Sequence, residues 1–288
     1  GEVISYYKNG GIRFTALFKD DLLNGLLKSF DEDGNITATQ LYKDSKEKYK
    51  IAYSYDKNGK LNAEGNFVDG KLQGIFKNYK NGKLIKEAYY VADKLNGGTN
   101  IYDENEELIR TARYKNGVKH GLITIYENKK ILIASNFKDD KEHGVRKYFN
   151  SDDQVTKEAF YDTGKKQDKS IEYEYENGRL KYSREHHKTI QHGVTKKYYA
   201  NGKIELELTY KDGKLNGAWK GYYSSGALKD EITYKNDKLN GLAKTYFESG
   251  ALDSELTYKN DKLNGLAKQY FESGELSWET VYKNGAKV

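Results

Sequence analysis

The chain has 288 residues, of which 49 are Lys or Arg and 43 are Asp or Glu, and it contains no Cys, Met or Pro. The absence of cysteine excludes a disulfide scaffold, a thiol nucleophile and a Cys-ligated zinc site. No run of residues approaches the roughly 18 apolar residues of a membrane-spanning helix. With 36% hydrophobic residues, the chain is too polar for two closely packed cores of ordinary composition.

The first residue is Gly1 and methionine is absent, so we expect a processed or trimmed product. Abundant Lys, Asn, Tyr and Ile are typical of an AT-rich bacterial genome, and the lack of cysteine fits an exported protein. These features favour export or the cell envelope of a bacterium over the cytoplasm.

A repeat of 24 residues runs through the whole sequence. GLAKTYFESGALDSELTYKNDKLN (241–264) is followed by GLAKQYFESGELSWETVYKNGAKV (265–288). Twelve such units account for all 288 residues. The repeats are degenerate over 1–192 and nearly identical over 193–288. The sequence therefore predicts one continuous repeat domain, 1–288, with no separate domain or linker.

Three columns of residues define the unit. The third column is aromatic from Phe18 to Tyr282, except for His186. The first column is aromatic in all units: Tyr7, Phe30, Tyr55, Tyr79, Tyr102, Tyr126, Phe149, Tyr175, Tyr199, Tyr223, Phe247, Phe271. The second is aliphatic: Ile12, Ile36, Leu61, Leu84, Leu108, Ile131, Val155, Leu180, Ile204, Leu228, Leu252, Leu276. The second and third columns are six residues apart, an even spacing that places them on one face of a strand.

Turn signals separate the columns. Asn201-Gly202, Ser225-Gly226, Ser249-Gly250 and Ser273-Gly274 lie between the first and second columns, while Asp212-Gly213, Asn236-Asp237 and Asn260-Asp261 follow the third. Such pairs supply the positive φ of two-residue hairpin turns. We therefore predict an all-β fold: an elongated, twisted, single-sheet antiparallel meander of about twelve 24-residue β-hairpin repeats, open rather than closed.

A hairpin turn centred on Ser249-Gly250 fixes which residues of the two strands face each other. It predicts that Phe247 faces Leu252, Ala243 faces Leu256 and Gly241 faces Tyr258, with the tyrosine ring lying over the bare glycine backbone. On the other face it pairs Tyr246–Asp253, Lys244–Glu255 and Leu242–Thr257, and in other units Lys196–Glu207, Lys220–Glu231 and Lys268–Glu279. Around the next turn it pairs Tyr258 with Leu263. Opposite charges at facing positions support this register.

The run K-L-N-G-x-x-K-x-Y-F-x-S-G-x-L at Lys238–Leu252 resembles the bacterial variant of the MORN repeat, known from a family named antitoxin-like (the YwqK type). The resemblance covers the chain, most strongly over 193–288. It implies an elongated repeat sheet used for binding or as a scaffold, without naming the partner.

A candidate binding surface comes from the near-identical repeats. Tyr198, Tyr222, Tyr246 and Tyr270 precede the first column and should point to the opposite face, beside Lys196, Lys220, Lys244 and Lys268. Earlier units have residues such as Ser29 and Ser54 before the first column, which suggests that the sheet does not need an aromatic there. Two interpretations remain open: packing of the rings over lysine stems, or an exposed aromatic ribbon that docks a protein or glycan.

Other chemistry finds less support. His120, His143 and His192 stand in a turn column where other units have Asn, and His186 and His187 interrupt a degenerate unit, so we predict no metal site and no cofactor. Paired carboxylates such as Asp20-Asp21 lie in turns and suggest no catalytic pair. Each ladder lysine faces a glutamate, which disfavours nucleic acid.

We therefore expect a non-enzymatic bacterial scaffold that binds another protein. The alternatives are an antitoxin-like protein that neutralises a toxin, and an exported surface module that binds host protein or glycan. The terminal strands must pair with another chain, be covered by further residues or fray, so end-to-end or edge-mediated self-association stays open.

Overall fold

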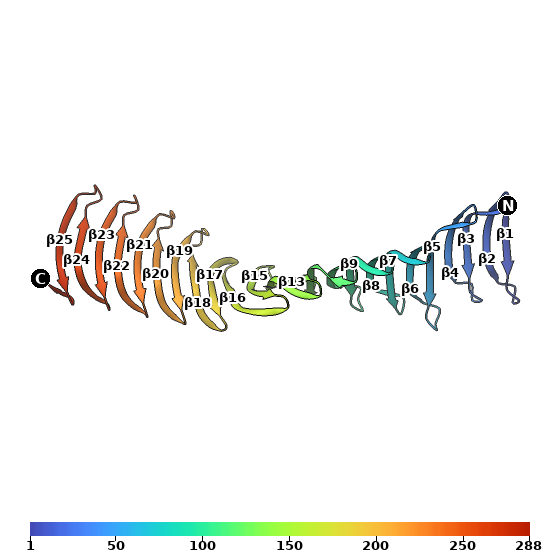
Figure 1. Ribbon diagram of the computed structural model, residues 1–288, viewed down its shortest axis with the longest axis horizontal. Coiled ribbons are helices and arrows are strands. Elements are labelled where there is room, and N and C mark those ends of the chain that lie inside the picture. Colours follow the sequence, from blue (N-terminus) through green and yellow to red (C-terminus); the bar gives the residue numbers. More distant parts are fainter. The chain divides into compact units, whose positions relative to one another are not determined.

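The computed structural model describes residues 1–288, and every regular element in it is a β-strand (Figure 1). The chain contains no helix that could cross a membrane. It forms two compact units, Gly1–Gly144 and Val145–Val288, and the boundary falls within β14 (Lys141–Phe149). A single continuous domain stays a prediction.

The first unit contains the strands β1 (Glu2–Tyr6), β2 (Ile12–Lys19), β3 (Leu22–Phe30), β4 (Ile36–Lys43), β5 (Lys46–Tyr55), β6 (Leu61–Val68), β7 (Lys71–Lys80), β8 (Lys83–Val91), β9 (Lys94–Tyr102), β10 (Leu108–Lys115), β11 (Val118–Lys119), β12 (Gly121–Glu127) and β13 (Lys130–Lys138). The second contains β15 (Val155–Asp162), β16 (Lys165–Glu176), β17 (Arg179–His187), β18 (Ile190–Tyr198), β19 (Ile204–Lys211), β20 (Lys214–Tyr222), β21 (Leu228–Lys235), β22 (Lys238–Tyr246), β23 (Leu252–Lys259), β24 (Lys262–Tyr270), β25 (Leu276–Lys283) and β26 (Ala286–Lys287).

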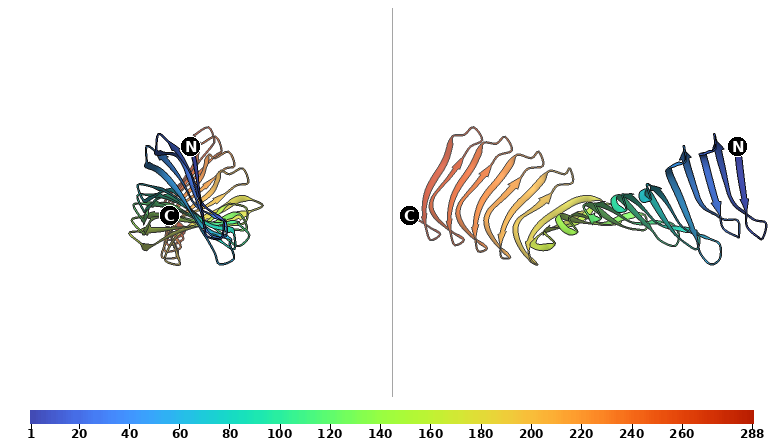
Figure 2. Two further views of the ribbon diagram at one scale, coloured as in Figure 1. Left: turned by 90° about the vertical axis from the view of Figure 1, so that its right-hand side faces the viewer. Right: turned by 45° about the vertical axis from the view of Figure 1, so that its right-hand side comes forward.

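Within each unit, consecutive strands pair antiparallel along the chain. The pairing confirms the predicted all-β antiparallel meander, and Figure 2 shows how strand direction turns progressively within each unit. The structure has two strands more than the two per repeat that the sequence predicts. One arises because β11 is separated from β12 at His120, and the other is β26, a two-residue strand at the end of the chain. A meander with neighbour-only pairing makes the stability of each unit nearly a sum of local terms.

Two kinds of turn alternate along the hairpins. Asn236 (φ 48°) and Asp237 (φ 67°) form the predicted two-residue turn with two left-handed residues. The turn after β22 is longer than predicted. Phe247 N–H donates to the Ala251 carbonyl, and Gly250 N–H donates to the Phe247 carbonyl, both at 2.9 Å. The loop therefore has three residues and ends on a left-handed glycine.

The longer turn shifts the register at its end. Lys244–Glu255, Ala243–Leu256 and Gly241–Tyr258 pair as predicted, as does Tyr258–Leu263. The predicted pairs Phe247–Leu252 and Tyr246–Asp253 are wrong, because a bulge between Thr245 and Tyr246 places Tyr246 opposite Leu252. The bulge absorbs the extra turn residue without disturbing the rest of the ladder.

The glycine of the KLNG run has a backbone conformation that favours glycine. Gly217, Gly241 and Gly265 have φ of 127–129°, in a region that side chains rarely adopt. A Cβ on Gly241 would lie 3.0 Å from Cβ of Thr233, on the preceding strand. A positive φ at a strand irregularity therefore favours glycine here. The tyrosine ring lying over it stays a prediction.

Successive repeats are joined at their turns as well as along their strands. Asp237 N–H donates to the Leu215 carbonyl at 2.9 Å, and Leu215 N–H donates to Asp237 Oδ1 at 2.8 Å. The same reciprocal pair links Asp261 to Leu239. The Asp of each such turn therefore ties its hairpin to the previous repeat through two hydrogen bonds.

The sheet has a thin core. One face of each unit, here called the alanine face, carries the buried alanines: Ala16, Ala38, Ala88, Ala112 in the first unit and Ala159, Ala243, Ala267 in the second. No large side chain is fully buried. The other face, here called the lysine face, carries Lys244 and its equivalents. Since one layer of strands leaves both faces in contact with solvent, most large side chains are only half-buried.

Candidate binding surfaces

The lysine face of strands β18–β25 in the second unit carries a charge ladder. Glu231 lies opposite Lys220 on one side and Lys244 on the other, and the alternation continues strand by strand. The predicted within-hairpin pairs are ion pairs of 3.2–3.9 Å: Lys196–Glu207, Lys220–Glu231, Lys244–Glu255 and Lys268–Glu279. A ladder of alternating sign has no net basic stripe to attract a phosphate backbone.

Each lysine is held by its glutamate. The hydrogen bond that Lys220 donates to Glu231 raises the pKa of Lys220, and the bond that Lys244 donates to Glu255 raises the pKa of Lys244. Both lysines therefore stay charged and paired at neutral pH. Their side chains are about one-third exposed, so the pairs contribute modestly to stability.

The four candidate tyrosines end strands β18, β20, β22 and β24. Tyr198, Tyr222, Tyr246 and Tyr270 are all half-buried. Each lies opposite the second-column aliphatic residue of its hairpin. A role of these tyrosines in binding stays a prediction.

The premise that earlier units lack this aromatic is wrong. Phe30 lies opposite Ile36, Tyr55 opposite Leu61 and Tyr79 opposite Leu84, the same arrangement as Tyr246 opposite Leu252. The sequence columns aligned these residues with Phe247 and its equivalents, because the later turns begin with an extra aromatic. The strand-end aromatic is therefore a packing element of the sheet in both degenerate and regular repeats.

The extra turn aromatics bridge neighbouring hairpins. The hydroxyl of Tyr199 donates to the Tyr222 carbonyl at 2.7 Å, and that of Tyr223 donates to the Tyr246 carbonyl at 2.8 Å. Where the turn instead begins with aspartate, as at Asp56, one carboxylate oxygen accepts two backbone N–H groups of its own turn, at 2.8 and 2.9 Å. These bonds lower the pKa of Asp56.

A stripe of apolar side chains on the first unit escaped the sequence analysis. It consists of Leu17, Leu26, Leu41 and Tyr49, here called the apolar stripe, on the lysine face of β2–β5. Leu41 pairs with Leu26 and with Tyr49, and Leu17 lies against Gly25. Leu17 is 44% exposed, and Leu26 and Tyr49 nearly as much. The signal was present in the repeat, since the equivalent of Leu17 in three of the near-identical units is a threonine: Thr209, Thr233 and Thr257.

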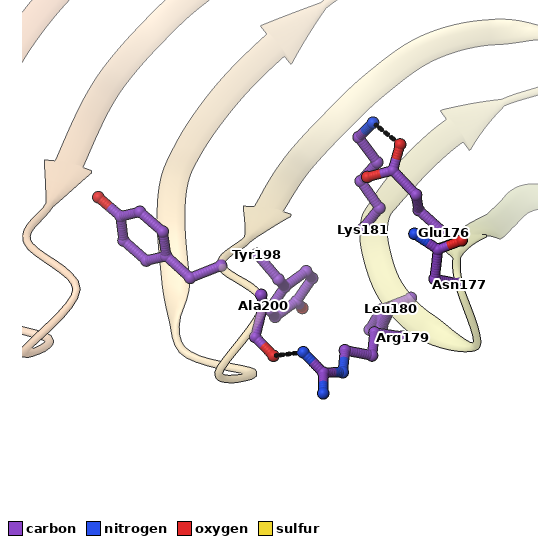
Figure 3. A pocket seen from close by; sticks show the side chains of 8 residues that line it. Glu176, Asn177, Arg179, Leu180, Lys181, Tyr198 and Ala200 are labelled. Atoms are coloured by element: carbon purple, nitrogen blue, oxygen red, sulfur yellow. Dashed lines mark hydrogen bonds and ion pairs between the residues drawn. The ribbon is translucent and has the colours of Figure 1, made fainter.

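A polar hollow of about 270 Å³ lies between the β16–β17 and β18–β19 turns (Figure 3). Tyr198 and Leu180 line it together with Glu176 and Arg179. Lys181 Nζ pairs with Glu176 Oε1 at 2.7 Å, and Arg179 Nη1 donates to the Ala200 carbonyl at 3.2 Å. Of the predicted candidates, Tyr198 alone lines this hollow.

The prediction of turn residues is wrong for His143 and His192, which lie in the strands β14 and β18, and His120 lies between β11 and β12. His120 lies 3.4 Å from Asp139, and His192 lies 3.3 Å from Asp212. The same contact is made by Asn24 to Asp44 near the start of the chain, at 3.2 Å. His187 contacts Asp168 at 3.3 Å. No group of three or more His, Asp or Glu side chains is arranged to hold a metal ion.

Comparison with solved structures gives only weak likenesses. The S. aureus TarM G117R mutant, in complex with fondaparinux, alpha-GlcNAc-glycerol and UDP, is 22% identical over 39% of this chain and 18% of its own, with a TM-score of 0.21. TcdB2-TccC3 is 13% identical over 98% of this chain and 17% of its own, with a TM-score of 0.25. The Photorhabdus luminescens Tc holotoxin pore is 15% identical over 95% of this chain and 16% of its own, with a TM-score of 0.24.

The chain thus spans less than a fifth of the length of each of these structures, and TM-scores this low carry no argument about fold or function. No curated protein matches the chain.

The sequence pattern of a known repeat family matches at both ends of the chain. The matched segments are 1–20, 23–44, 48–69, 191–212, 215–236, 239–260 and 263–284, which together make up more than half of the residues. Each segment covers the paired strands and turns of one repeat, such as β22 and β23 in 239–260. The chain therefore belongs to the MORN repeat variant family.

Proposed function

We propose that this MORN repeat chain is a non-enzymatic scaffold that binds another protein in a bacterium, and that the apolar stripe is its docking surface. The observation that carries the proposal is the exposure of Leu17, Leu26 and Tyr49, side by side on a regular sheet face. Contiguous exposed apolar side chains on a soluble domain mark interaction sites.

The surroundings of the stripe favour a protein partner. Lys28 and Thr39, which face each other beside it, give the patch a polar margin. An apolar centre with a polar rim is the usual composition of a protein interface. A nucleic acid would need a net basic surface.

The repeat architecture supports a scaffold role. Pairing only between neighbouring strands builds a broad surface without an enclosed pocket in which a reaction could be shielded from water. The hollows along the sheet are small: about 270, 160 and 210 Å³.

Site-specific photo-crosslinking in the source bacterium tests this proposal. A photoreactive residue replaces Leu17 in one variant and Thr233 in the other, because Thr233 is the exposed residue at the equivalent position of a regular repeat. We expect a discrete protein adduct from position 17 that is absent from position 233 and is lost when Leu26→Glu is added. Equal labelling at both positions, or no discrete adduct, would refute the proposal. A small toxin or an envelope protein in the adduct would identify which kind of scaffold this is.

A further inference from the structure

We propose that the hollow beside Tyr198 binds a single pyranose ring, as a free sugar or as one unit of a glycan. This goes beyond the proposed protein scaffold and uses a different unit of the chain.

The hollow exists because two unlike hairpin ends lie side by side. The β16–β17 hairpin closes with the two-residue turn Asn177-Gly178, whereas the β18–β19 hairpin closes with a three-residue turn that begins at Tyr199. Between regular repeats, the turn tyrosine fills this space, as Tyr199 does by reaching the Tyr222 carbonyl. The β16–β17 turn has no aromatic to do the same, so the space beside Tyr198 stays unfilled.

The wall of the hollow suits one apolar face of a sugar. Tyr198 is anchored by a 3.3 Å hydrogen bond between its hydroxyl and Ser183 Oγ, and Leu180 lines the hollow with it. The electron-rich face of an aromatic ring attracts the positively polarised C–H groups that a pyranose presents on its faces. Because the ring is already fixed by Ser183, little side-chain freedom is lost on binding.

The polar groups suit hydroxyls, each of which both donates and accepts. Glu176 uses Oε1 for Lys181 and keeps Oε2 as an acceptor. Arg179 uses Nη1 for the Ala200 carbonyl and keeps Nη2 and Nε as donors. The Asn177 side chain adds a donor and an acceptor at the same rim. The lining therefore offers both donors and acceptors. Figure 3 shows the two interactions that some of these groups already make, Lys181 with Glu176 and Arg179 with Ala200.

Two other ligand classes fit less well. An anion would lie beside the Glu176 carboxylate, and Lys181 is already neutralised by that carboxylate, which leaves only Arg179 to attract it. A larger apolar ligand would need more room, because drug-sized molecules occupy pockets of about 300–1,000 Å³.

The first unit provides an internal comparison. The hollow of about 160 Å³ at Lys80, Asn81 and Glu104 also lies between a two-residue turn and a three-residue turn. Its Lys83 Nζ donates to the Glu104 carbonyl at 2.8 Å, which matches Arg179 and Ala200. No aromatic residue lines it. We therefore expect sugar to bind at the hollow beside Tyr198 and not at the hollow beside Lys80.

Saturation-transfer NMR on the full chain with methyl β-D-glucopyranoside tests the inference. This sugar has only equatorial substituents and so presents two unobstructed C–H faces. We expect saturation of its ring protons with a dissociation constant of about 1 mM, as for a ligand of this size. Tyr198→Leu should weaken binding about tenfold, whereas Tyr246→Leu, the same change at a regular repeat, should leave binding unchanged.

Thermal unfolding of both variants controls for the fold, because each loses the same ring from the same strand-end position. Loss of binding in both variants, or no binding to the wild-type chain, would overturn the inference. Displacement of the sugar by equimolar sulfate would also overturn it, because it would mark an anion site. Cellotetraose distinguishes the source: equal affinity for glucoside and cellotetraose supports a free sugar or chain end, and tighter binding of cellotetraose supports a glycan chain.

Discussion

Substitution of the KLNG glycine tests the account of the strand irregularity most directly. Gly241→Ala forces an L-side chain to a φ of 129° and places its Cβ 3.0 Å from Thr233 Cβ. A backbone strained in this region costs about 1–3 kcal/mol, and crowding a packed site adds about 1 kcal/mol more. We therefore expect a loss of about 3 kcal/mol of unfolding free energy.

Gly250→Ala is the matched control. Gly250 also has a positive φ, of 90°, but a Cβ there would meet no atom within 4 Å. Only the backbone penalty applies, about 1 kcal/mol. Gly250→Ala therefore measures the ordinary cost of a side chain at a positive φ. The additional loss in Gly241→Ala measures the crowding at Thr233 and the more extreme φ of Gly241.

Circular dichroism and hydrogen exchange provide the assay. For a unit of this size, the melting temperature should fall by roughly 6–12 °C in Gly241→Ala and by roughly 2–4 °C in Gly250→Ala. Because each repeat packs only against its neighbours, faster exchange in Gly241→Ala should centre on β21–β23. An equal loss in both variants, or faster exchange spread evenly over the second unit, would refute the reasoning.

Three further predictions concern single interactions. Tyr223→Phe removes the hydroxyl that bridges to the Tyr246 carbonyl and should lower stability by about 1 kcal/mol in thermal unfolding. Lys244→Glu should destabilise, because it places a third carboxylate in a row with Glu231 and Glu255, and Glu255→Lys should couple favourably with it in a double-mutant cycle in low salt. The lowered pKa of Asp56 means that its stabilisation is complete above its ordinary value of 3.8 and is lost as the pH falls through the folded-state value, so wild type should be more stable than Asp56→Asn at neutral pH and should lose this advantage in acid.

Each of these has a clear contrary result. Unchanged stability of Tyr223→Phe would mean that water replaces the hydroxyl at no cost. A coupling that persists in 1 M salt would show that the charge pair acts through packing rather than through charge. A stability difference between wild type and Asp56→Asn that is the same at neutral and acid pH would show that the carboxylate does not hold its turn.

Much of the sheet could be predicted from the repeat, because two facts about strands are local. Side chains alternate between the two faces of a strand, and the residue numbers of all facing pairs in one antiparallel hairpin add up to the same value. The pairs Ala243–Leu256, Lys244–Glu255 and Gly241–Tyr258 followed from these facts alone. The ends of the strands did not, because a two-residue and a three-residue turn can share the same Ser-Gly signal, and the difference shows only in which carbonyl the Gly250 N–H reaches.

The candidate site was harder to predict than the fold for the same reason. The sequence columns aligned Tyr199 with Tyr55, whereas the structure places Tyr198 at the position of Tyr55. Because of this one-residue difference, the sequence analysis treated Tyr198 as an additional aromatic residue of the later repeats, whereas it is the packing aromatic found at the same strand end in earlier repeats. The hollow beside Tyr198 also depends on turn length, since it forms only where a short turn meets a long one.

The spacing of aromatic, aliphatic and glycine residues was enough to determine an antiparallel meander of hairpins, because strand pairing between neighbours depends only on the residues of those neighbours. Which side chains are left exposed, and where a hollow opens, was decided by the three-dimensional packing. Exposure of Leu17 depends on what its neighbouring strands carry, and the space beside Tyr198 depends on two turns that are about one repeat apart in the chain.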